Sequence, residues 1–170
     1  MTEGLIIVHT GDGKGKTTAA LGLALRAFGA GLQVLILQFI KGGQKYGELD
    51  ALKNLQIEIR QCGLGFTKSG EISEHKAAAQ ATLKIAQDEI ISGNRDLIIL
   101  DEINYAVKFN LITESEIFEL IKKRPPKLHL LLTGRDALPK IIEIADLVTE
   151  MKLIKHPFQK GIKAQRGIEF

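Results

Sequence analysis

Glycines alternate with polar and cationic residues in one short stretch near the start of the chain, and these residues are the best placed to do chemistry. They are Thr10, Gly11, Asp12, Gly13, Lys14, Gly15, Lys16, Thr17 and Thr18. Small residues let backbone N–H groups converge on a polyphosphate, and the ammonium of Lys16 can reach its distal phosphates. The hydroxyl of Thr17 is placed to bind Mg²⁺ or Mn²⁺ beside those phosphates. The stretch therefore predicts a phosphate-binding loop.

The residues on either side supply the strand and the helix that such a loop requires. Residues 5–10 predict an apolar strand, and residues 16–28 predict a helix that ends at Gly29-Ala30-Gly31. The loop is a variant of G-x-x-x-x-G-K-[ST], because Thr10 occupies the first glycine position. A flexible glycine turn with a solvated lysine is the alternative, and the order strand, loop, helix argues against it.

Two carboxylates follow a second apolar run. Residues 97–100 are Leu-Ile-Ile-Leu, and Asp101 and Glu102 come next. A carboxylate at the tip of a strand can hold a metal beside the hydroxyl of Thr17, directly or through water. Solvated strand-end acids are the alternative, which the phosphate-binding loop in the same chain makes less attractive. We therefore expect Thr17, Asp101 and Glu102 to form a metal site.

Further polar residues follow other predicted strands. Residues 34–37 are followed by Gln38 and Lys41, and residues 128–132 are followed by Thr133-Gly134-Arg135. Ligands bind at the carboxyl ends of strands in open α/β sheets, so the loop from Gln38 to Gly43 is a candidate site, and Arg135 could meet a phosphate or a ribose. An ordinary exit turn and a solvated arginine are the alternatives.

The remaining pattern places these motifs in one fold class. Helices are expected at residues 47–55, 72–92, 113–123 and 136–145, and strands at 57–60 and 147–154. Residues 103–110 are expected to cross the top of the sheet. Strands alternating with helices predict an α/β three-layer domain with a largely parallel sheet, formed as one domain by residues 1–170. Residues 61–70 either fold back on the core or contact a ligand, and the tail 155–170 resembles a loop ordered over a ligand or a partner chain.

Composition excludes several classes of protein. The formal charge of +3 and an aromatic content of 5% lack the electrostatic and stacking signatures of a nucleic-acid-binding module. One cysteine excludes an internal disulfide framework, and the four histidines show no ligand spacing. No basic-then-apolar leader or membrane-length run is present, so we expect a cytoplasmic protein without a membrane partner.

The whole pattern resembles the corrinoid adenosyltransferases with a RecA-like P-loop fold, and the resemblance covers nearly the whole chain. The loop after residue 37 and the C-terminal ending are its most specific parts. The matching residues are Thr10 to Thr18, Arg26-Ala27, Gln38-Phe39-Ile40-Lys41-Gly42, Gly47-Glu48, Gly65-Phe66-Thr67, Leu100-Asp101-Glu102, Thr133-Gly134-Arg135, Ala145-Asp146, Lys155-His156 and Gly161 to Phe170.

The resemblance implies transfer of the 5′-deoxyadenosyl group of ATP to the Co(I) of a corrinoid, cob(I)yrinic acid a,c-diamide or cob(I)alamin, with triphosphate as the leaving group. Lys16 and Glu102 would stabilise the leaving charge, the latter through Mg²⁺ or Mn²⁺. The nucleotide-binding set would extend beyond the loop to Arg26, Gln38, Lys41, Glu48 and Arg135. The family is described as holding ATP in the reversed direction, as receiving electrons from a donor such as a flavoprotein, and as forming homodimers.

Phe66 matches an aromatic residue that the family is thought to pack under the corrin to exclude the lower cobalt ligand. Where relatives place tryptophan two residues later, this sequence has Lys68, and it contains no tryptophan. The sequence also begins only a few residues before the first predicted strand. We therefore expect that the covering role of the longer N-terminal segment found in some relatives is absent or filled otherwise.

A P-loop NTPase that hydrolyses or transfers the γ-phosphate is the alternative function, with Glu102 orienting water instead of holding metal. It would use the same residues. The six arginines form no lid-like cluster, which weakens a small-molecule kinase interpretation.

Overall fold

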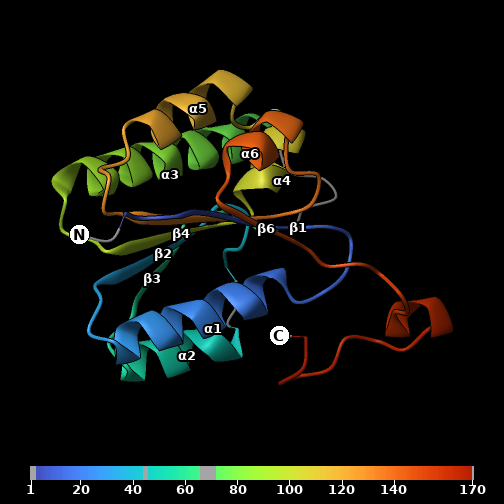
Figure 1. Cartoon of the computed structure of the whole chain (residues 1–170). Helices are drawn as coiled ribbons and strands as arrows, with labels where there is room; N and C mark the ends of the chain where they lie inside the picture. Colours follow the sequence, from blue (N-terminus) through green and yellow to red (C-terminus); the bar gives the residue numbers. More distant parts are fainter. Residues whose placement is uncertain (1–2, 44–45, 66–71, 170) are drawn as a thin grey trace.

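A parallel sheet with helices on both faces forms the body of the molecule (Figure 1). The computed structural model describes residues 3–43, 46–65 and 72–169. Across the sheet the six strands are β3 (Glu58–Gln61), β2 (Val34–Gln38), β4 (Leu97–Asp101), β5 (His129–Thr133), β1 (Ile6–Thr10) and β6 (Leu147–Glu150). Every pair of neighbours is parallel. The predicted three-layer α/β architecture is confirmed.

The helices divide between the two faces of the sheet (Figure 1). One face carries α1 (Lys16–Gly29) and α2 (Gly47–Asn54); the other carries α3 (Ile72–Ser92), α4 (Ile103–Lys108), α5 (Glu114–Lys122) and α6 (Pro139–Ile144). Alternate strand residues enter the two resulting cores: Val8 packs on the α3 side and Ile7 on the α1 side. Because both faces are covered, strands β2 and β4 are continuous apolar runs. Within the described ranges, no helix is both long and apolar enough to cross a membrane.

Most elements begin and end within two residues of the predicted positions, and three differ. The helix expected at residues 136–145 begins three residues later, as α6 at Pro139, because Leu138 before this proline has a non-helical ψ of 137°. Residues 103–108 form α4 rather than a plain connection, because Ile103 and Ala106 are fully buried against the core. The predicted last strand stops at Glu150 instead of residue 154. The chain there turns away from the sheet plane, although the Met151 N–H still donates to the Thr10 carbonyl at 2.8 Å.

A capping box satisfies the backbone N–H groups at the start of α5. The Glu116 N–H donates to Thr113 Oγ1 at 3.3 Å, and the Thr113 N–H donates to the Glu116 carboxylate at 2.7 Å.

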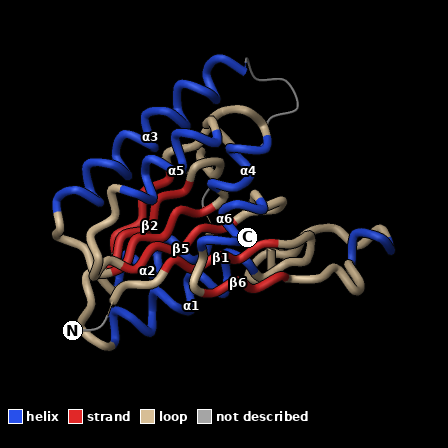
Figure 2. The backbone as a smooth tube through the Cα atoms, turned by 45° about the horizontal axis from the view of Figure 1, so that its top comes forward, coloured by secondary structure: helices blue, strands red, loops and turns tan. Residues whose placement is uncertain are grey.

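Residues 151–169 form an extended tail beyond β6. The tail runs outward to a short 3₁₀ helix, η1 (Pro157–Lys160), and turns back below the start of α1, as Figure 1 shows. In Figure 2 the same segment projects from the β6 side of the sheet as loop with one helical turn. Most of its residues are exposed, so it is held to the body by few apolar contacts.

Candidate functional site

The predicted phosphate-binding loop joins β1 to α1 at the carboxyl edge of the sheet. Gly11 and Gly15 have φ values of 94° and 110°, a left-handed conformation that favours glycine. Lys16 is only 7% exposed, and its Nζ donates to the carbonyls of Gly11 at 2.6 Å and Gly13 at 2.7 Å. Burial lowers the pKa of this ammonium, an effect that the Glu102 carboxylate opposes. The loop therefore presents a buried cation at the start of a helix, as an anion site requires.

The same loop packs closely against the base of the tail. The Gly13 N–H donates to the Met151 carbonyl at 2.7 Å. A Cβ on Gly11 would lie 2.5 Å from the Met151 oxygen, and a Cβ on Gly13 would lie 2.7 Å from the carbonyl oxygens of Met151 and Lys152. Glycine is thus required at both positions for contact with the tail as well as for approach to a phosphate.

Asp101 is the centre of a buried hydrogen-bond network at the tip of β4. Its side chain is 1% exposed, and Oδ1 accepts from the hydroxyls of Thr17 at 2.9 Å and Thr133 at 2.8 Å. Its Oδ2 accepts from Gln38 Nε2 at 3.0 Å and lies 3.8 Å from Lys41 Nζ. One carboxylate therefore fixes the last residues of β2 and β5, a lysine in the loop after β2 and a threonine at the start of α1.

Glu102 follows in an unusual backbone conformation. Its φ is 62°, in the left-handed region that non-glycine residues seldom adopt, and its N–H donates to Thr133 Oγ1 at 2.9 Å. Burial raises the pKa of its carboxyl, and the neighbouring Asp101 raises it further, while the nearby cations Lys16, Lys41 and Arg135 lower it. Glu102 is thus a poorly solvated carboxylate beside the loop, the kind of group that a bound cation stabilises.

The oxygen atoms gathered here fit a hard divalent cation. Thr17 supplies a hydroxyl and Asp101 and Glu102 supply carboxylates, and Mg²⁺ in nucleotide sites takes one or two such protein ligands, with phosphate and water completing the shell. No group of three or more His, Cys, Asp or Glu residues that could hold a metal occurs among the described residues. An all-protein metal cage is therefore absent from that part of the chain.

A cavity of about 740 Å³ opens over the loop. Its lining consists of Asp12, Gly13, Lys14, Gly15, Lys16, Thr17, Thr18, Leu21, Lys41, Gly47, Glu48, Glu102, Tyr105, Arg135, Gly167, Ile168 and Glu169. Most predicted loop residues thus share one cavity with Lys41, Glu48 and Arg135, which come from three other parts of the chain. On its wall, Lys41 Nζ lies 3.4 Å from the Glu48 carboxylate.

Other predicted residues stand outside this lining. Thr10 is buried, and its Oγ1 accepts from the Ala137 N–H at 3.2 Å, so it anchors the loop from behind. Arg26 is exposed in the last turn of α1, about 15 Å along the helix from its start. Gln38 contacts the site indirectly, through the hydrogen bond that its Nε2 donates to Asp101. Phe66, with the neighbouring Lys68, lies outside the described residues.

The loop after β3 is tied to the loop after β2. The Gly65 N–H donates to the Ile40 carbonyl at 2.8 Å, and the Gly63 N–H donates to the Lys41 carbonyl at 3.1 Å. A Cβ on Gly42 would overlap the Gly63 carbonyl. Of the two alternatives for residues 61–70, the described part folds back on the body, while Leu64 stays 48% exposed at the surface.

Several site residues carried no separate expectation. Thr133 matched the family pattern without a role, although the strand-end rule that singled out Arg135 applies to it equally. Tyr105 lies on α4, which was not expected to be a helix, and its ring packs 4.2 Å from that of Phe109. Tail residues 167–169 also line the cavity, and Lys14 donates to the Glu169 carboxylate. Residues 167–169 of the tail thus form part of the wall of this cavity, as the alternative of a loop ordered over a ligand would require.

Comparisons with known proteins agree on one family. Residues 2–170 match the family described as "ATP:corrinoid adenosyltransferase BtuR/CobO/CobP". A corrinoid adenosyltransferase of Sinorhizobium sp. is 41% identical over 173 residues, covering 99% of this chain and 81% of that protein. The corrinoid adenosyltransferase of Pseudomonas aeruginosa is 40% identical, over 99% of this chain and 84% of its own. That of Salmonella typhimurium is 38% identical, over 99% and 86% respectively.

Proposed function

The chain belongs to the ATP:corrinoid adenosyltransferase family, and from this premise we propose how its own residues carry out the ATP-dependent adenosylation of a corrinoid. The observation that carries the proposal is that the phosphate-binding loop shares one cavity with Glu102, Lys41, Glu48 and Arg135. It joins a site for a triphosphate to a ring of charged side chains at the carboxyl edge of the sheet.

The reaction joins cobalt to the 5′ carbon of ATP and breaks the bond from that carbon to the α-phosphate oxygen. Co(I) of the corrinoid supplies the electron pair, and triphosphate leaves with the pair of the broken bond. Because the nucleophile is already strong, the protein needs no activated serine or water. It must hold the 5′ carbon in line with cobalt and stabilise the charge that develops on triphosphate, which the loop N–H groups and Lys16 are arranged to do.

The order of the strands supports one direction of ATP in the loop. The segment with Phe66 follows β3, at the opposite edge of the sheet from β6. If that segment lies under the corrin, the 5′ carbon faces the β2 and β3 side and the terminal phosphate faces Arg135 and β6. We propose this orientation, which is also the reversed direction that the resemblance implies.

A divalent cation fits beside this nucleotide. Thr17 and Glu102 would hold Mg²⁺ or Mn²⁺, and Asp101, with its four partners, would orient the Thr17 hydroxyl. When bound, the cation would neutralise charge on the phosphates. The direction of the Glu102 pKa shift supports this assignment, since a buried carboxylate next to Asp101 gains most from a cation.

The central experiment identifies the phosphate product. The protein is incubated with ATP, Mg²⁺ and chemically reduced corrinoid; we expect triphosphate and a light-sensitive cobalt–carbon product. Release of ADP and phosphate without dependence on corrinoid would support the P-loop NTPase alternative instead. Lys16→Ala and Glu102→Gln are expected to lose most turnover while they remain folded, and Lys160→Ala, on the exposed η1, is the matched control.

Phe66 is proposed to act in the step that makes Co(I). Phe66→Ala should lose more activity with a Co(II) corrinoid plus reductant than with preformed Co(I). Equal losses would leave Phe66 a packing residue only. The reductant is proposed to be a one-electron donor such as a flavoprotein, in the cytoplasm.

We further propose that the enzyme is a homodimer that covers the β6 edge of the sheet. β6 is an edge strand, and Leu147 and Val148 on it are 44% and 38% exposed. Val148→Lys should shift the sedimentation equilibrium toward monomer, whereas Leu25→Lys, an exposed leucine on α1, should not. A wild-type protein that sediments as a monomer at assay concentrations would exclude the dimer.

A further inference from the structure

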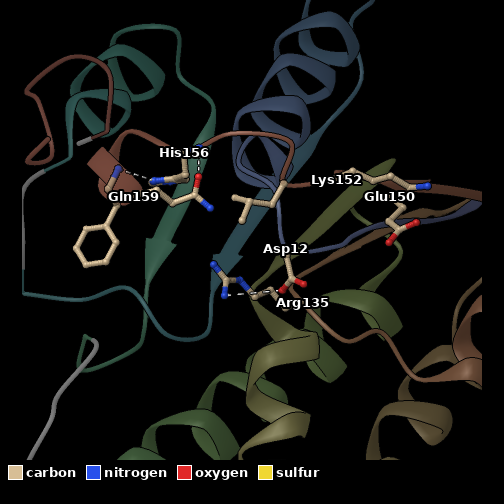
Figure 3. A pocket seen from close by; sticks show the side chains of 8 residues that line it. Asp12, Arg135, Glu150, Lys152, His156 and Gln159 are labelled. Carbon is tan, nitrogen blue, oxygen red and sulfur yellow. Dashed lines mark hydrogen bonds and ion pairs between the residues drawn. The ribbon is translucent and has the colours of Figure 1, made fainter. Parts of the chain in front are cut away.

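A second cavity, of about 670 Å³, lies on the β6 side of the phosphate-binding loop (Figure 3). Its lining consists of Asp12, Arg135, Glu150, Lys152, Leu153, His156, Phe158 and Gln159. Asp12 and Arg135 also line the cavity over the loop, so the two cavities are contiguous. A ligand in the loop that extends toward β6 would enter this second space.

Hydrogen bonds inside the tail determine which atoms of His156 and Gln159 remain available to a ligand in this cavity. The His156 N–H donates to Gln159 Oε1 at 3.2 Å, and the Phe158 N–H donates to His156 Nδ1 at 3.1 Å. Because Nδ1 accepts, the neutral imidazole carries its proton on Nε2. Both acceptor atoms are therefore used in the capping box at the start of η1, and the Gln159 amide nitrogen and His156 Nε2 are left as donors.

Arg135 faces these donors. Figure 3 shows its guanidinium beside Asp12, pointing toward the wall formed by His156 and Gln159. Arg135 Nη1 lies 3.9 Å from the Asp12 carboxylate, a loose pair in which both side chains are more than half exposed. Such an exposed ion pair contributes little free energy to the stability of the fold, so the guanidinium can pair with a phosphate instead. A guanidinium, a carboxamide N–H and an imidazole N–H together suit a ligand made only of acceptors.

We propose that this cavity, here called the leaving-group subsite, binds the terminal phosphate of ATP and of the tripolyphosphate product through Arg135, His156 and Gln159. The proposal rests on the proposed function and on the direction of ATP given above. It adds two tail residues to the groups that receive the leaving charge. It also gives tripolyphosphate a retained position after transfer, so the product inhibits by competing with ATP.

Calorimetric titration of the full-length protein with tripolyphosphate in the presence of Mg²⁺ tests the subsite directly. Gln159→Glu keeps the acceptor for the His156 N–H but replaces the donor with a negative charge, and we expect affinity to fall about tenfold or more. His156→Asn keeps a capping oxygen for the Phe158 N–H and removes Nε2, and should weaken binding about threefold to tenfold. Asp12→Asn removes a negative charge that repels the anion and should therefore tighten tripolyphosphate binding.

Lys160→Ala provides the control, because this cation lies on the same η1 and lines neither cavity. It should bind tripolyphosphate like the wild type. Unchanged affinity in both Gln159→Glu and His156→Asn would overturn the subsite. So would a loss of adenosine binding in these variants with tripolyphosphate binding intact, because the cavity would then hold the nucleoside.

The titration needs no corrinoid, so it separates the two proposals. If the wild-type protein fails to adenosylate a corrinoid while both variants still bind tripolyphosphate more weakly than the wild type, the proposed function fails and the anion subsite stands. If transfer proceeds and inhibition by tripolyphosphate is unchanged in both variants, the subsite fails and the proposed function stands.

Discussion

Replacing Thr133 by valine removes one hydroxyl that serves two partners in the site. Thr133 is fully buried; its Oγ1 donates to Asp101 Oδ1 at 2.8 Å and accepts from the Glu102 N–H at 2.9 Å. Valine has nearly the same shape, so the substitution removes hydrogen bonds without creating a large cavity. Asp101 would keep the Thr17 and Gln38 contacts, whereas the Glu102 N–H would lose its partner in a backbone conformation that is already strained.

The expected magnitude follows from these two losses. A hydrogen bond to a charged group contributes about 1.5–3 kcal/mol, and an N–H left unsatisfied costs about 1–3 kcal/mol, so we expect the free energy of unfolding to fall by about 3 kcal/mol. For a chain of this size, that lowers the melting temperature by about 6–12 °C. Because Glu102 would no longer be held beside the loop, turnover should fall by about tenfold or more even below the melting temperature.

Thermal unfolding and steady-state kinetics on three variants test this reasoning. Thr133→Ser keeps the hydroxyl and should recover most of the lost turnover. Thr82→Val is the matched control: Thr82 is also fully buried, but its Oγ1 donates only to the Ala78 carbonyl within α3. It should leave turnover unchanged. A Thr133→Val protein that melts within about 3 °C of the wild type would refute the role given to this hydroxyl.

Three further predictions concern the loop, the tail and the surface. Gly13→Ala should weaken ATP binding strongly, because its Cβ would lie 2.7 Å from two tail carbonyl oxygens, whereas Gly22→Ala, with open space around its Cβ, should not; equal ATP affinity in both would show that the loop moves freely. Glu169→Gln should lower the KM for ATP about twofold to fivefold, since the carboxylate no longer competes with phosphate for Lys14; an unchanged KM would contradict that competition. Glu89 accepts from Arg95 and Arg60, which hold the pKa of its carboxyl below the ordinary 4.5, so its contribution to stability is present at neutral pH and is lost as pH falls through the depressed folded pKa. Glu89→Gln should therefore destabilise the protein at pH 7 and have a diminishing effect in chemical unfolding below about pH 4; a difference independent of pH would exclude the ion pairs as its cause.

The sequence predicted those features that depend on local pattern. The apolar runs ending at Gln38, Asp101 and Thr133 predicted parallel strands, and the rule that ligands meet strand ends placed Lys41, Glu102 and Arg135 in one site. The position of β6 beside β1 could not be predicted from the sequence, because strand order depends on long-range packing. The contact of Gly13 with Met151 could not be predicted for the same reason. The local sequence around each residue gives no sign of the other, and the sheet order brings them together.

Strand order also bears on the choice between adenosyl transfer and γ-phosphate hydrolysis. Glu102 follows β4, Arg135 follows β5, and the tail follows β6, so these groups lie in this order across the carboxyl edge, away from the segment after β3. A hydrolase needs its water-orienting carboxylate at the terminal phosphate. In the proposed direction of ATP, which puts the terminal phosphate at Arg135 and the tail, Glu102 would lie toward the α-phosphate and the 5′ carbon. The same loop, cation site and carboxylate then favour attack at carbon, and the direction of ATP decides between the two reactions.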